Sequence, residues 1–264
     1  MGMVKYYNSA TGAWRDTLAE VLNTGIEVKP RDMLTREILN NSFAFDMTSP
    51  ICYHQDRGLS YKFMAAEALW ITSGSNSVSE IAPYNKYISE FSDNGEIFNG
   101  AYGPPFHEQV PYVVRALNSD EYTRQAVMTI WNRRPESSKD IPCTVALSWN
   151  IRQGRLNCHV FMRSSDAWLG LPYDVFNFTM MTCFIASKLE REVKPGLMFM
   201  NLVSSHLYER HFEGAAKVLE HLPDKETASI NEGMFQDWEY IHRSLLVCRD
   251  IAEKSNVSFW RIRP

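Results

Sequence analysis

The stretch that most constrains the fold of this chain is a hairpin followed by a helix that is apolar on every side. Residues 144–151 and 156–162 are rich in β-branched and aromatic side chains, which is typical of strands, and Arg152-Gln153-Gly154-Arg155 predicts the turn between them. Residues 173–189 form a long apolar stretch that predicts a helix. A helix with no polar face must be buried, which is typical of a domain that combines a sheet with helices.

Shorter patterns indicate the other elements. The remaining predicted strands lie at residues 126–131 and 197–204, and the remaining predicted helices at residues 14–22, 59–71, 208–222 and 235–253. Helices and strands do not alternate regularly, so we expect an α+β fold with a mixed sheet and packed helices. With 264 residues and no linker or internal repeat, the sequence predicts a single domain over residues 1–264.

Composition and charge exclude several classes of protein. A net charge of −4 and a pI near 6.0 argue against direct DNA binding and against a basic membrane-surface protein. The N-terminus has no secretory pattern and no apolar run approaches about 18 residues, so we expect no membrane association. The expected location is the cytoplasm, or the host cytoplasm for a phage-encoded protein. The five cysteines form no CxxC pair, which disfavours disulfides and a metal site.

Cys143 and Glu67 are the first candidates for chemistry. Cys143 follows Pro142 at the start of a predicted strand, where it is either a buried structural cysteine or a thiolate nucleophile. For a single cysteine the structural alternative is the commoner one, because a nucleophile also needs a nearby positive charge. Glu67 lies in a largely apolar predicted helix, where a carboxylate is costly unless a hydrogen-bond partner or a catalytic role explains it.

Ordered motifs around these residues resemble the thymidylate synthase family. The resemblance rests on Pro142-Cys143, on RSSD at residues 163–166, on LGLPYD at residues 169–174, and on His206 and Tyr208 in SSHLYERH. Weaker matches upstream are Glu67 in AEALW, Tyr102 in GAYG, Arg124 seven residues before Trp131, and Arg31 if one gap is allowed. The resemblance covers roughly residues 25 to 215. It implies a thymidylate synthase-like fold that dimerises through its sheet.

The resemblance implies a covalent mechanism on a pyrimidine nucleotide. Cys143 adds to C6 of the base, and C5 then takes the one-carbon unit of 5,10-methylenetetrahydrofolate, with no metal involved. Glu67 moves protons through a water network, and Tyr102 assists at C5. Arg163 binds the phosphate and lowers the pKa of the thiol, as a fixed cation near a thiolate should.

The resemblance also implies which residues hold the ligands. Folate contacts are expected from Asp166 and Gly170. Nucleotide contacts are expected from Arg31, Arg124, Arg163, Ser164, Asp174, His206 and Tyr208. Arg124 reaches the phosphate of the neighbouring subunit, so the active form is expected to be a homodimer.

Asp174 is the departure from the family pattern that bears most on the substrate. It occupies the position of the family's uracil-reading asparagine. A carboxamide complements the N3–H and O4 of uracil, whereas a carboxylate accepts from the N4 amino group of cytosine, and from N3 once that nitrogen is protonated. A mismatched buried polar pair costs about 1–3 kcal/mol, so Asp174 favours a cytidine nucleotide. The alternative is that Asp174 only caps its helix.

Two more departures indicate hydroxymethyl transfer. Thr144 replaces a histidine that follows the nucleophile in many members, and Cys-Thr together with Asp174 resembles the phage-type deoxycytidylate hydroxymethylases. The position of the family's water-excluding tryptophan falls at Ile88, which favours attack by water. Gln125 replaces one of the paired arginines, which leaves Arg133 or Arg134 as substitutes, and residues 258–264 lack the family's apolar ending.

These patterns predict a dCMP or CMP 5-hydroxymethyltransferase. Its catalytic residues are expected to be Cys143, Glu67, Tyr102 and Asp174. The alternatives are a cytidylate C5-methyltransferase that releases dihydrofolate, a thymidylate synthase acting on dUMP, and an inactive nucleotide-binding or RNA-binding relative. A binding module needs no nucleophile together with a proton-transferring glutamate, which argues against the last of these.

Overall fold

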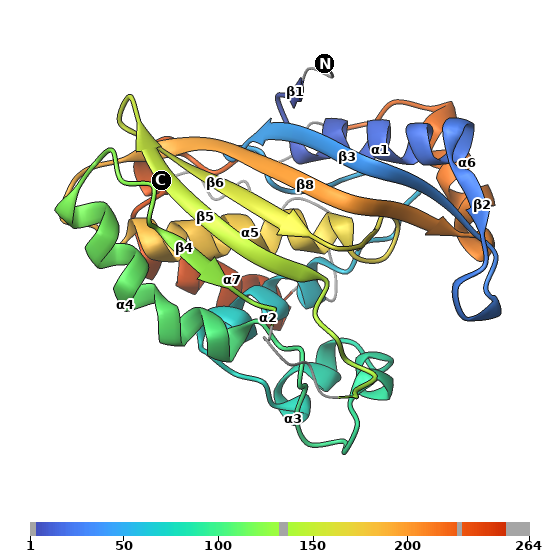
Figure 1. The fold of residues 1–264 in the computed structure, drawn as a ribbon, viewed down its shortest axis with the longest axis horizontal. Helices are drawn as coiled ribbons and strands as arrows, with labels where there is room; N and C mark the ends of the chain where they lie inside the picture. The colour runs from blue at the N-terminus through green and yellow to red at the C-terminus, as the bar shows by residue number, and fades with distance from the viewer. Residues whose placement is uncertain (1–3, 132–136, 226–228, 252–264) are drawn as a thin grey trace.

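The protein is built on one mixed sheet, shown in Figure 1 as a computed structural model that describes residues 4–131, 137–225 and 229–251. The strands run in the order β1 (Lys5–Tyr7), β3 (Thr35–Asp46), β8 (Lys194–Tyr208), β6 (Arg155–Met162), β5 (Thr144–Arg152) and β4 (Val127–Thr129). Two short strands lie off this path: β2 (Ile26–Val28) pairs with β3, and β7 (Ser165–Asp166) pairs with β8. The β6–β8 pair is parallel and the β3–β8 pair is antiparallel, which confirms the predicted mixed sheet.

Helices cover one face of this sheet. They are α1 (Ala10–Thr24), α2 (Tyr61–Thr72), α3 (Val78–Ile81), α4 (Gly103–Ser119), α5 (Leu171–Ala186), α6 (Phe212–Glu220) and α7 (Trp238–Ile251). Helix α5 lies against the sheet, α2 packs on α5, and α7 packs on α2 (Figure 1). The architecture is therefore α+β. Within the described part of the chain, no helix is both long and apolar enough to span a membrane.

The alternation of side chains along the strands explains why one sheet face is covered. In β8, Met198, Met200 and Leu202 are buried beneath the helices. Their neighbours point to the other face, where Val203 and Phe161 are exposed. Successive side chains of a strand alternate between faces, so this second face is left open in the single chain.

Helix α5 is buried because its sequence carries almost no polar surface. Its few hydroxyl groups are satisfied locally: Thr179 and Thr182 each donate to the carbonyl four residues earlier, both at 2.8 Å. Trp149 of β5 donates its indole N–H to the Thr182 hydroxyl at 3.1 Å and so joins α5 to the sheet. A fixed α5 gives the residues of its first turn a fixed position.

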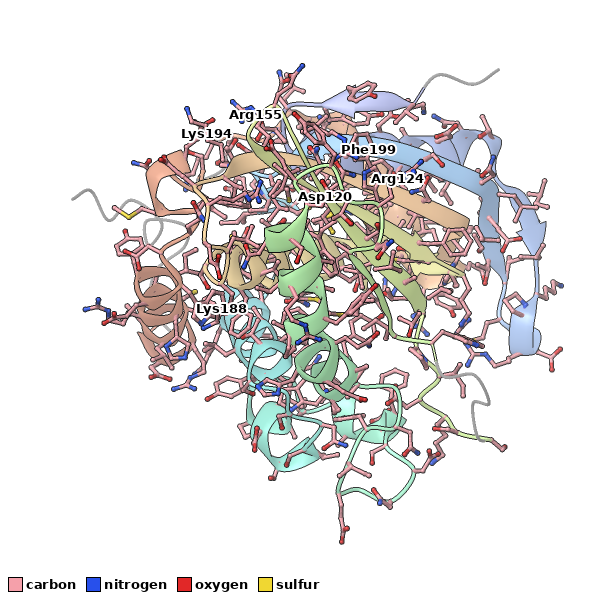
Figure 2. All side chains as sticks on the ribbon, turned by 60° about the vertical axis from the view of Figure 1, so that its left-hand side comes forward. Asp120, Arg124, Arg155, Lys188, Lys194 and Phe199 are labelled. Atoms are coloured by element: carbon pink, nitrogen blue, oxygen red, sulfur yellow. The ribbon has the colours of Figure 1, made fainter. Side chains whose placement is uncertain are left out.

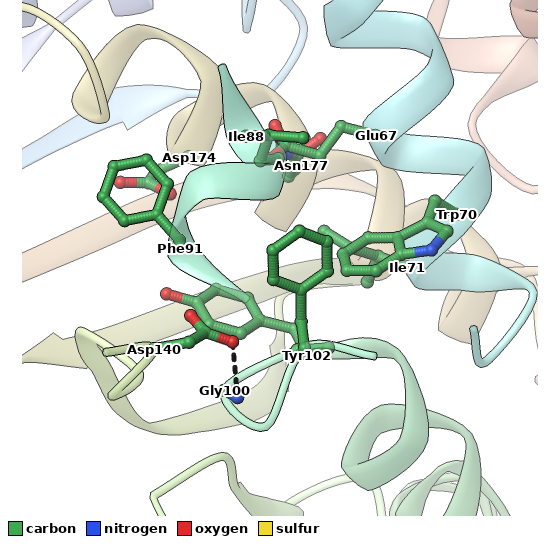
Figure 3. Close-up of a pocket in the computed structure, with 12 residues that line it drawn as sticks. Glu67, Trp70, Ile71, Ile88, Phe91, Gly100, Tyr102, Asp140, Asp174 and Asn177 are labelled. Atoms are coloured by element: carbon green, nitrogen blue, oxygen red, sulfur yellow. Dashed lines mark hydrogen bonds between the residues drawn. The ribbon is translucent and has the colours of Figure 1, made fainter. Parts of the chain in front are cut away.

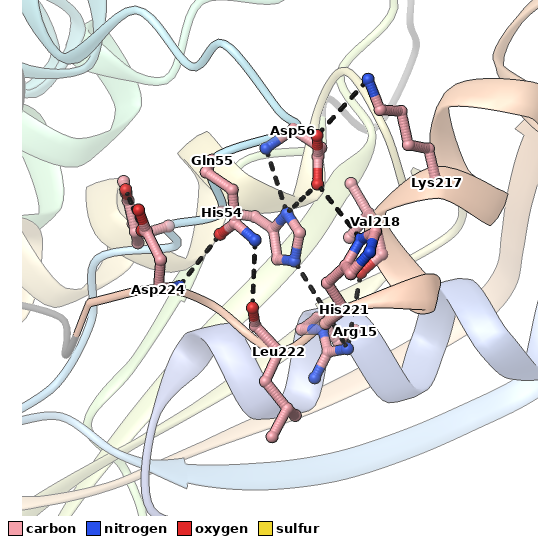
Figure 4. Close-up of polar contacts among 10 residues, drawn as sticks. Arg15, His54, Gln55, Asp56, Lys217, Val218, His221, Leu222 and Asp224 are labelled. Atoms are coloured by element: carbon pink, nitrogen blue, oxygen red, sulfur yellow. Dashed lines mark hydrogen bonds and ion pairs between the residues drawn. The ribbon is translucent and has the colours of Figure 1, made fainter.

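A polar cluster anchors the loop that leads into α2 (Figure 4). The buried His54 contacts the carbonyl of His221 through Nε2 at 3.2 Å, and its Nδ1 accepts from the Asp56 N–H at 3.2 Å. Arg15 donates to the same His221 carbonyl at 2.6 Å, and Lys217 pairs with Asp56 at 3.4 Å. The cluster ties this loop to α1 and to the end of α6.

Most sequence-based elements are confirmed. The strands and helices expected at residues 144–151, 156–162, 59–71 and 173–189 coincide with β5, β6, α2 and α5 apart from their ends. Those expected at residues 14–22, 126–131, 197–204 and 235–253 match α1, β4, β8 and α7 with shifted bounds; residues 252–253 lie outside the described residues.

The helix predicted over residues 208–222 is wrong at its start, and β3 and α4 are the longest of the elements that were missed. Tyr208 ends β8, Glu209–His211 forms a 3-10 turn, and α6 begins only at Phe212. The sequence indicated neither β3 nor α4. Strand β3 mixes polar and apolar residues because only part of it is buried, and α4 contains Pro111, which breaks a helical pattern.

Gly103 tests how tightly the start of α4 is packed. A Cβ at this position would lie 2.2 Å from the Ser75 carbonyl oxygen, which is backbone and cannot swing away. Gly103→Ala should therefore lower the free energy of unfolding by about 2 kcal/mol or more, as overpacking does. Urea denaturation measures this. The control is Gly58→Ala, where a Cβ meets nothing within 4 Å. Equal stability of the Gly103→Ala protein and the wild type would contradict the packing.

Candidate active site

A pocket of about 190 Å³ opens between α2, the first turn of α5 and the segments around residues 88–102 (Figure 3). It is lined by Glu67, Trp70, Ile71, Ile88, Phe91, Phe98, Gly100, Ala101, Tyr102, Asp140, Asp174 and Asn177. Three carboxyl groups therefore share one small space with aromatic and aliphatic walls. Figure 3 shows Glu67 beside Asn177 on one wall and Asp140 beside Tyr102 on another.

Glu67 is held by one specific partner. The Asn177 side-chain amide donates to Glu67 Oε2 at 2.7 Å. Burial raises the pKa of Glu67 to about 7, although the hydrogen bond from Asn177 opposes the shift. The Asn177 Oδ1 atom is itself buried and has no partner among the described residues. Glu67 is therefore a carboxyl group able to gain or lose a proton near neutral pH.

Asp174 lies in the first turn of α5 and faces the same pocket. Burial raises the pKa of this carboxyl group well above the usual aspartate range, and the nearby Glu67 and Asp166 raise it further. The N-terminus of a helix favours a negative charge, but burial outweighs that effect here. A Cβ on Gly170 would lie 3.3 Å from Asp174 Oδ2, so the glycine leaves room for the carboxyl group.

Tyr102 is fixed by the residue that follows the predicted nucleophile. Its hydroxyl accepts from the Thr144 hydroxyl at 2.9 Å and from the Thr144 N–H at 3.3 Å. Its ring stacks on Phe178 of α5, with ring centres 6.3 Å apart. Burial raises the pKa of Tyr102, so the phenol keeps its proton and can donate it as a hydrogen bond into the pocket.

Cys143 is partly buried directly before β5, and its charge environment corrects one expectation. Arg163 lowers the pKa of the thiol as predicted, but burial raises it by more, and Asp174 and Asp140 also raise it. The net pKa is therefore raised rather than lowered. Removal of charge from the neighbouring carboxyl groups would favour the thiolate.

Arg163 fixes the backbone that carries Cys143. It donates from Nε to the Pro142 carbonyl and from its terminal nitrogen to the Ile141 carbonyl, each at 3.0 Å. Its guanidinium lies 5.5 Å from the ring centre of Trp131. The arginine therefore positions the cysteine through the main chain as well as through its charge.

Other predicted nucleotide-binding residues meet at the end of β8. The Ser164 hydroxyl lies 3.4 Å from His206 Nδ1, and the His206 and Tyr208 rings meet edge to face with centres 5.3 Å apart. Arg31 donates to the Tyr208 hydroxyl at 3.4 Å, although the sequence match for Arg31 needed a gap. The structure thus brings Arg31, Ser164, His206 and Tyr208 together.

Asp166 and Gly170 form the turn that leads into α5. Asp166 Oδ1 accepts from the N–H groups of Trp168 at 2.8 Å and Leu169 at 2.9 Å, and the Asp166 carbonyl accepts from the Gly170 N–H at 3.1 Å. One carboxylate oxygen of Asp166 is thus used by the turn. No described residue donates to the other oxygen, Oδ2.

Arg124, a predicted phosphate-binding residue, contacts none of the other predicted site residues within the described part of the chain. It is exposed, and it makes no hydrogen bond or ion pair with any described residue. Figure 2 labels Arg124, which lies in the segment between α4 and β4. Its neighbour Gln125 is also exposed. The suggested substitutes Arg133 and Arg134, and the C-terminal segment 258–264, lie outside the described residues.

The sequence reasoning missed Asp140 and Asn177. Asp140 comes three residues before Cys143, and Asn177 follows Asp174 by three residues, which places it on the same face of α5. The helical spacing was the only available signal for Asn177. No signal of this kind marks Asp140, which comes from a loop.

Comparison with known proteins identifies the family of this chain. A family model described as thymidylate synthase matches residues 12–244. The chain belongs to the thymidylate synthase family. A deoxyuridylate hydroxymethyltransferase from Bacillus phage SP01 is 29% identical to it over 221 residues, which cover 75% of this chain and 57% of that relative. The matched region thus spans little more than half the length of the curated relative.

The pocket walls have the chemistry to hold one heteroaromatic ring, such as a nucleobase or the ring of the folate co-substrate used by this family. The aromatic side chains of Trp70 and Phe91 and the aliphatic side chain of Ile71 can pack on a heteroaromatic ring. The carboxyl groups that line the same pocket can accept hydrogen bonds from the N–H groups of that ring. Within the described ranges, no three His, Cys, Asp or Glu side chains are grouped so as to hold a metal ion.

The raised pKa of Glu67 predicts a pH-dependent stability. The folded protein keeps a proton on Glu67 up to a pH of about 7, whereas the unfolded chain releases it near the ordinary value of 4.5. The contribution of Glu67 to stability is therefore most favourable below about pH 4.5 and falls as the pH rises through this window. Relative to Glu67→Gln, the free energy of unfolding of the wild type should fall by about 1–3 kcal/mol between about pH 5 and 8.

Urea titrations across that pH range measure the difference. The control is Glu96→Gln, which changes an exposed carboxylate outside the pocket. A constant difference between the wild type and Glu67→Gln at every pH would show that Glu67 titrates like an exposed glutamate.

Proposed function

We propose that this chain is a single catalytic domain over residues 1–264 that hydroxymethylates C5 of a cytidine monophosphate nucleotide, dCMP or CMP. Cys143 adds to C6 of the base, which makes C5 nucleophilic. The co-substrate 5,10-methylenetetrahydrofolate supplies the one-carbon unit when bound, with Asp166 and Gly170 at its pterin and no metal. Water then attacks the one-carbon unit on C5, and release of the thiolate from C6 frees the product.

The observation that carries this proposal is the position and protonation of Asp174. In its neutral form, the carboxyl group donates to N3 of cytosine and accepts from the N4 amino group. It can also pass its proton to N3 as the thiolate adds at C6, so the negative charge that develops in the ring is neutralised. An amide at this position offers the same hydrogen bonds but has no proton to transfer.

Glu67 and Tyr102 are suited to the remaining proton transfers. Glu67 has a pKa of about 7, which lets it exchange protons with pocket water near neutral pH. Tyr102 is held by two hydrogen bonds from Thr144 and directs its own O–H into the pocket, where it assists removal of the proton at C5.

Hydroxymethyl rather than methyl transfer is supported by Ile88. This residue lines the pocket at the position expected for the family's water-excluding tryptophan, and its smaller side chain leaves space for water. The relative from Bacillus phage SP01 is named as a hydroxymethyltransferase.

The nucleotide's sugar and phosphate are assigned to the cluster at the end of β8. His206 and Tyr208 contact the ribose, and Arg31, Arg163 and Ser164 face the phosphate. Arginine suits this role because its planar guanidinium can hold two phosphate oxygens at once. Arg163 does so while it also holds the backbone at Pro142.

We also propose a homodimer through the open face of the sheet. That face exposes Phe161 and Val203, and the ring of His159 stacks on Phe199 with centres 4.5 Å apart. Arg124 is exposed and has no hydrogen-bond or ion-pair partner among the described residues. In a twofold dimer, the exposed Arg124 of one subunit would complete the phosphate site of the other.

A second candidate substrate is deoxyuridylate. The relative's name specifies deoxyuridylate. The neutral form of Asp174 also complements uracil, since it donates to O4 and accepts from N3–H. Incubating the protein with methylenetetrahydrofolate and CMP, dCMP or dUMP in turn, and identifying each product by mass, separates the candidates. Formation of the 5-methyl nucleotide with dihydrofolate would refute hydroxymethylation.

Asp174→Asn should move base preference toward uracil. The variant keeps the hydrogen-bonding pattern but loses the transferable proton, so turnover of the cytidine nucleotide should fall on the order of 100-fold while turnover of dUMP is preserved or raised. The ratio of kcat/KM for dCMP and dUMP measures this. An unchanged ratio would show that another residue chooses the base.

The shared site predicts complementation between inactive variants. Arg124→Ala and Cys143→Ala should each have little activity alone. After unfolding and refolding together, half of the dimers combine one subunit of each kind, and one site in each such dimer is intact, so about a quarter of wild-type activity should return. No recovery after mixing would show that Arg124 does not act across subunits.

A further inference from the structure

Asp140 is the pocket carboxylate that takes no part in the steps proposed above. It lines the pocket together with Ile88 and Phe91, which offer no hydrogen-bonding groups there. Buried carboxylates are costly, so one that persists in a small pocket needs a partner or a task. Three observations bear on what that task is.

The first observation is that Asp140 is held rigidly. Its Oδ2 accepts from the Gly100 N–H at 2.7 Å (Figure 3). A Cβ on Gly100 would lie 2.7 Å from the Asp140 carbonyl oxygen, so the two backbones touch and only glycine fits. Gly100 precedes Tyr102 by two residues and Asp140 precedes Cys143 by three, so the contact joins the segment that carries Tyr102 to the segment that carries Cys143.

The second observation is that one oxygen of the Asp140 carboxylate, Oδ1, can still accept a hydrogen bond. Within the described part of the chain, no residue donates a hydrogen bond to Asp140 Oδ1. Glu67 is engaged with Asn177, and Tyr102 is engaged with Thr144. Asp140 Oδ1, which would lie 3.0 Å from a Cβ on Gly100, is therefore an acceptor without a donor on the Gly100 side of the pocket.

The third observation is the electrostatic setting. Burial raises the pKa of Asp140, with a smaller increase from Asp93 and an opposing effect from the Gly100 N–H. Asp140 also lies close enough to Cys143 to raise the pKa of the thiol. A carboxylate that binds a proton more readily than usual is a better base.

We propose that Asp140 is the general base that binds and activates the water molecule which attacks the one-carbon unit on C5. This inference rests on the proposed hydroxymethyltransferase function. If Asp140 activates the water, this residue favours the hydroxymethyl product over the methyl product.

The step balances without a further reactant. The base carries a C5=CH₂ group and a bond from C6 to the Cys143 sulfur. The water oxygen forms a bond to the CH₂ carbon while Asp140 Oδ1 takes one water proton, and the π electrons of the C5=CH₂ bond move into the ring. They return as the C5=C6 double bond when the C6–S bond breaks, which releases the 5-hydroxymethyl nucleotide and the thiolate.

The test uses Asp140→Asn, because asparagine still accepts from the Gly100 N–H but is not a base. In a single turnover with a nucleotide tritiated at C5, tritium release reports the steps before water attack. The ratio of hydroxymethyl product to released tritium should fall by about 100-fold, while tritium release continues. An added thiol should trap the one-carbon unit as a thioether in the variant.

A second readout needs no folate. The wild type, given the 5-hydroxymethyl nucleotide in ¹⁸O-labelled water, should exchange the hydroxymethyl oxygen with solvent through the reverse and forward steps. Asp140→Asn should lose this exchange. The control is Glu96→Gln, which changes an exposed carboxylate that does not line the pocket.

The outcomes separate the two claims. An unchanged product ratio and unchanged ¹⁸O exchange in Asp140→Asn, with an active wild type, would overturn the role of Asp140 and leave the proposed function standing. A wild type that makes only the 5-methyl nucleotide and exchanges no oxygen would overturn both.

Discussion

The burial of several carboxyl groups in one small pocket is the constraint on which the rest of this site depends. Glu67, Asp140 and Asp174 share a space of about 190 Å³, and burial raises the pKa of each. Glu67 raises the pKa of Asp174 further, because like charges repel strongly where water is scarce. Glu67 and Asp174 therefore keep their protons to a higher pH than exposed carboxyl groups do, which suits a reaction that consists largely of proton transfers around an added thiolate.

The loops around the pocket give each of these groups a fixed position. Thr144 holds Tyr102, and the Gly100 N–H holds Asp140. Arg163 holds the carbonyl of Pro142, next to the nucleophile. Main-chain contacts therefore align Cys143 with its neighbours before any ligand binds, and such preorganisation is a large part of what an active site contributes to a rate.

Much of the fold was readable from the sequence, because α5 and the hairpin of β5 and β6 carry strong local patterns. Strand β3 could not be predicted in this way, because its burial depends on pairing with β8 along its whole length. Motif positions identified Cys143, Glu67 and Asp174 as candidates. They did not show that burial would outweigh Arg163 at the thiol, because burial is a property of the packed structure. Asp140 was missed for the same reason.

The most direct test of this account is a carbon-13 NMR titration of the side-chain carboxyl groups, with Glu67→Gln and Asp174→Asn spectra to assign the signals. The account predicts that Glu67 titrates with a midpoint near 7 and that Asp174 remains protonated well above the usual aspartate range. Midpoints near the ordinary values of about 4 for both groups would contradict it, because the pocket would then hold ionised carboxylates with no proton to give.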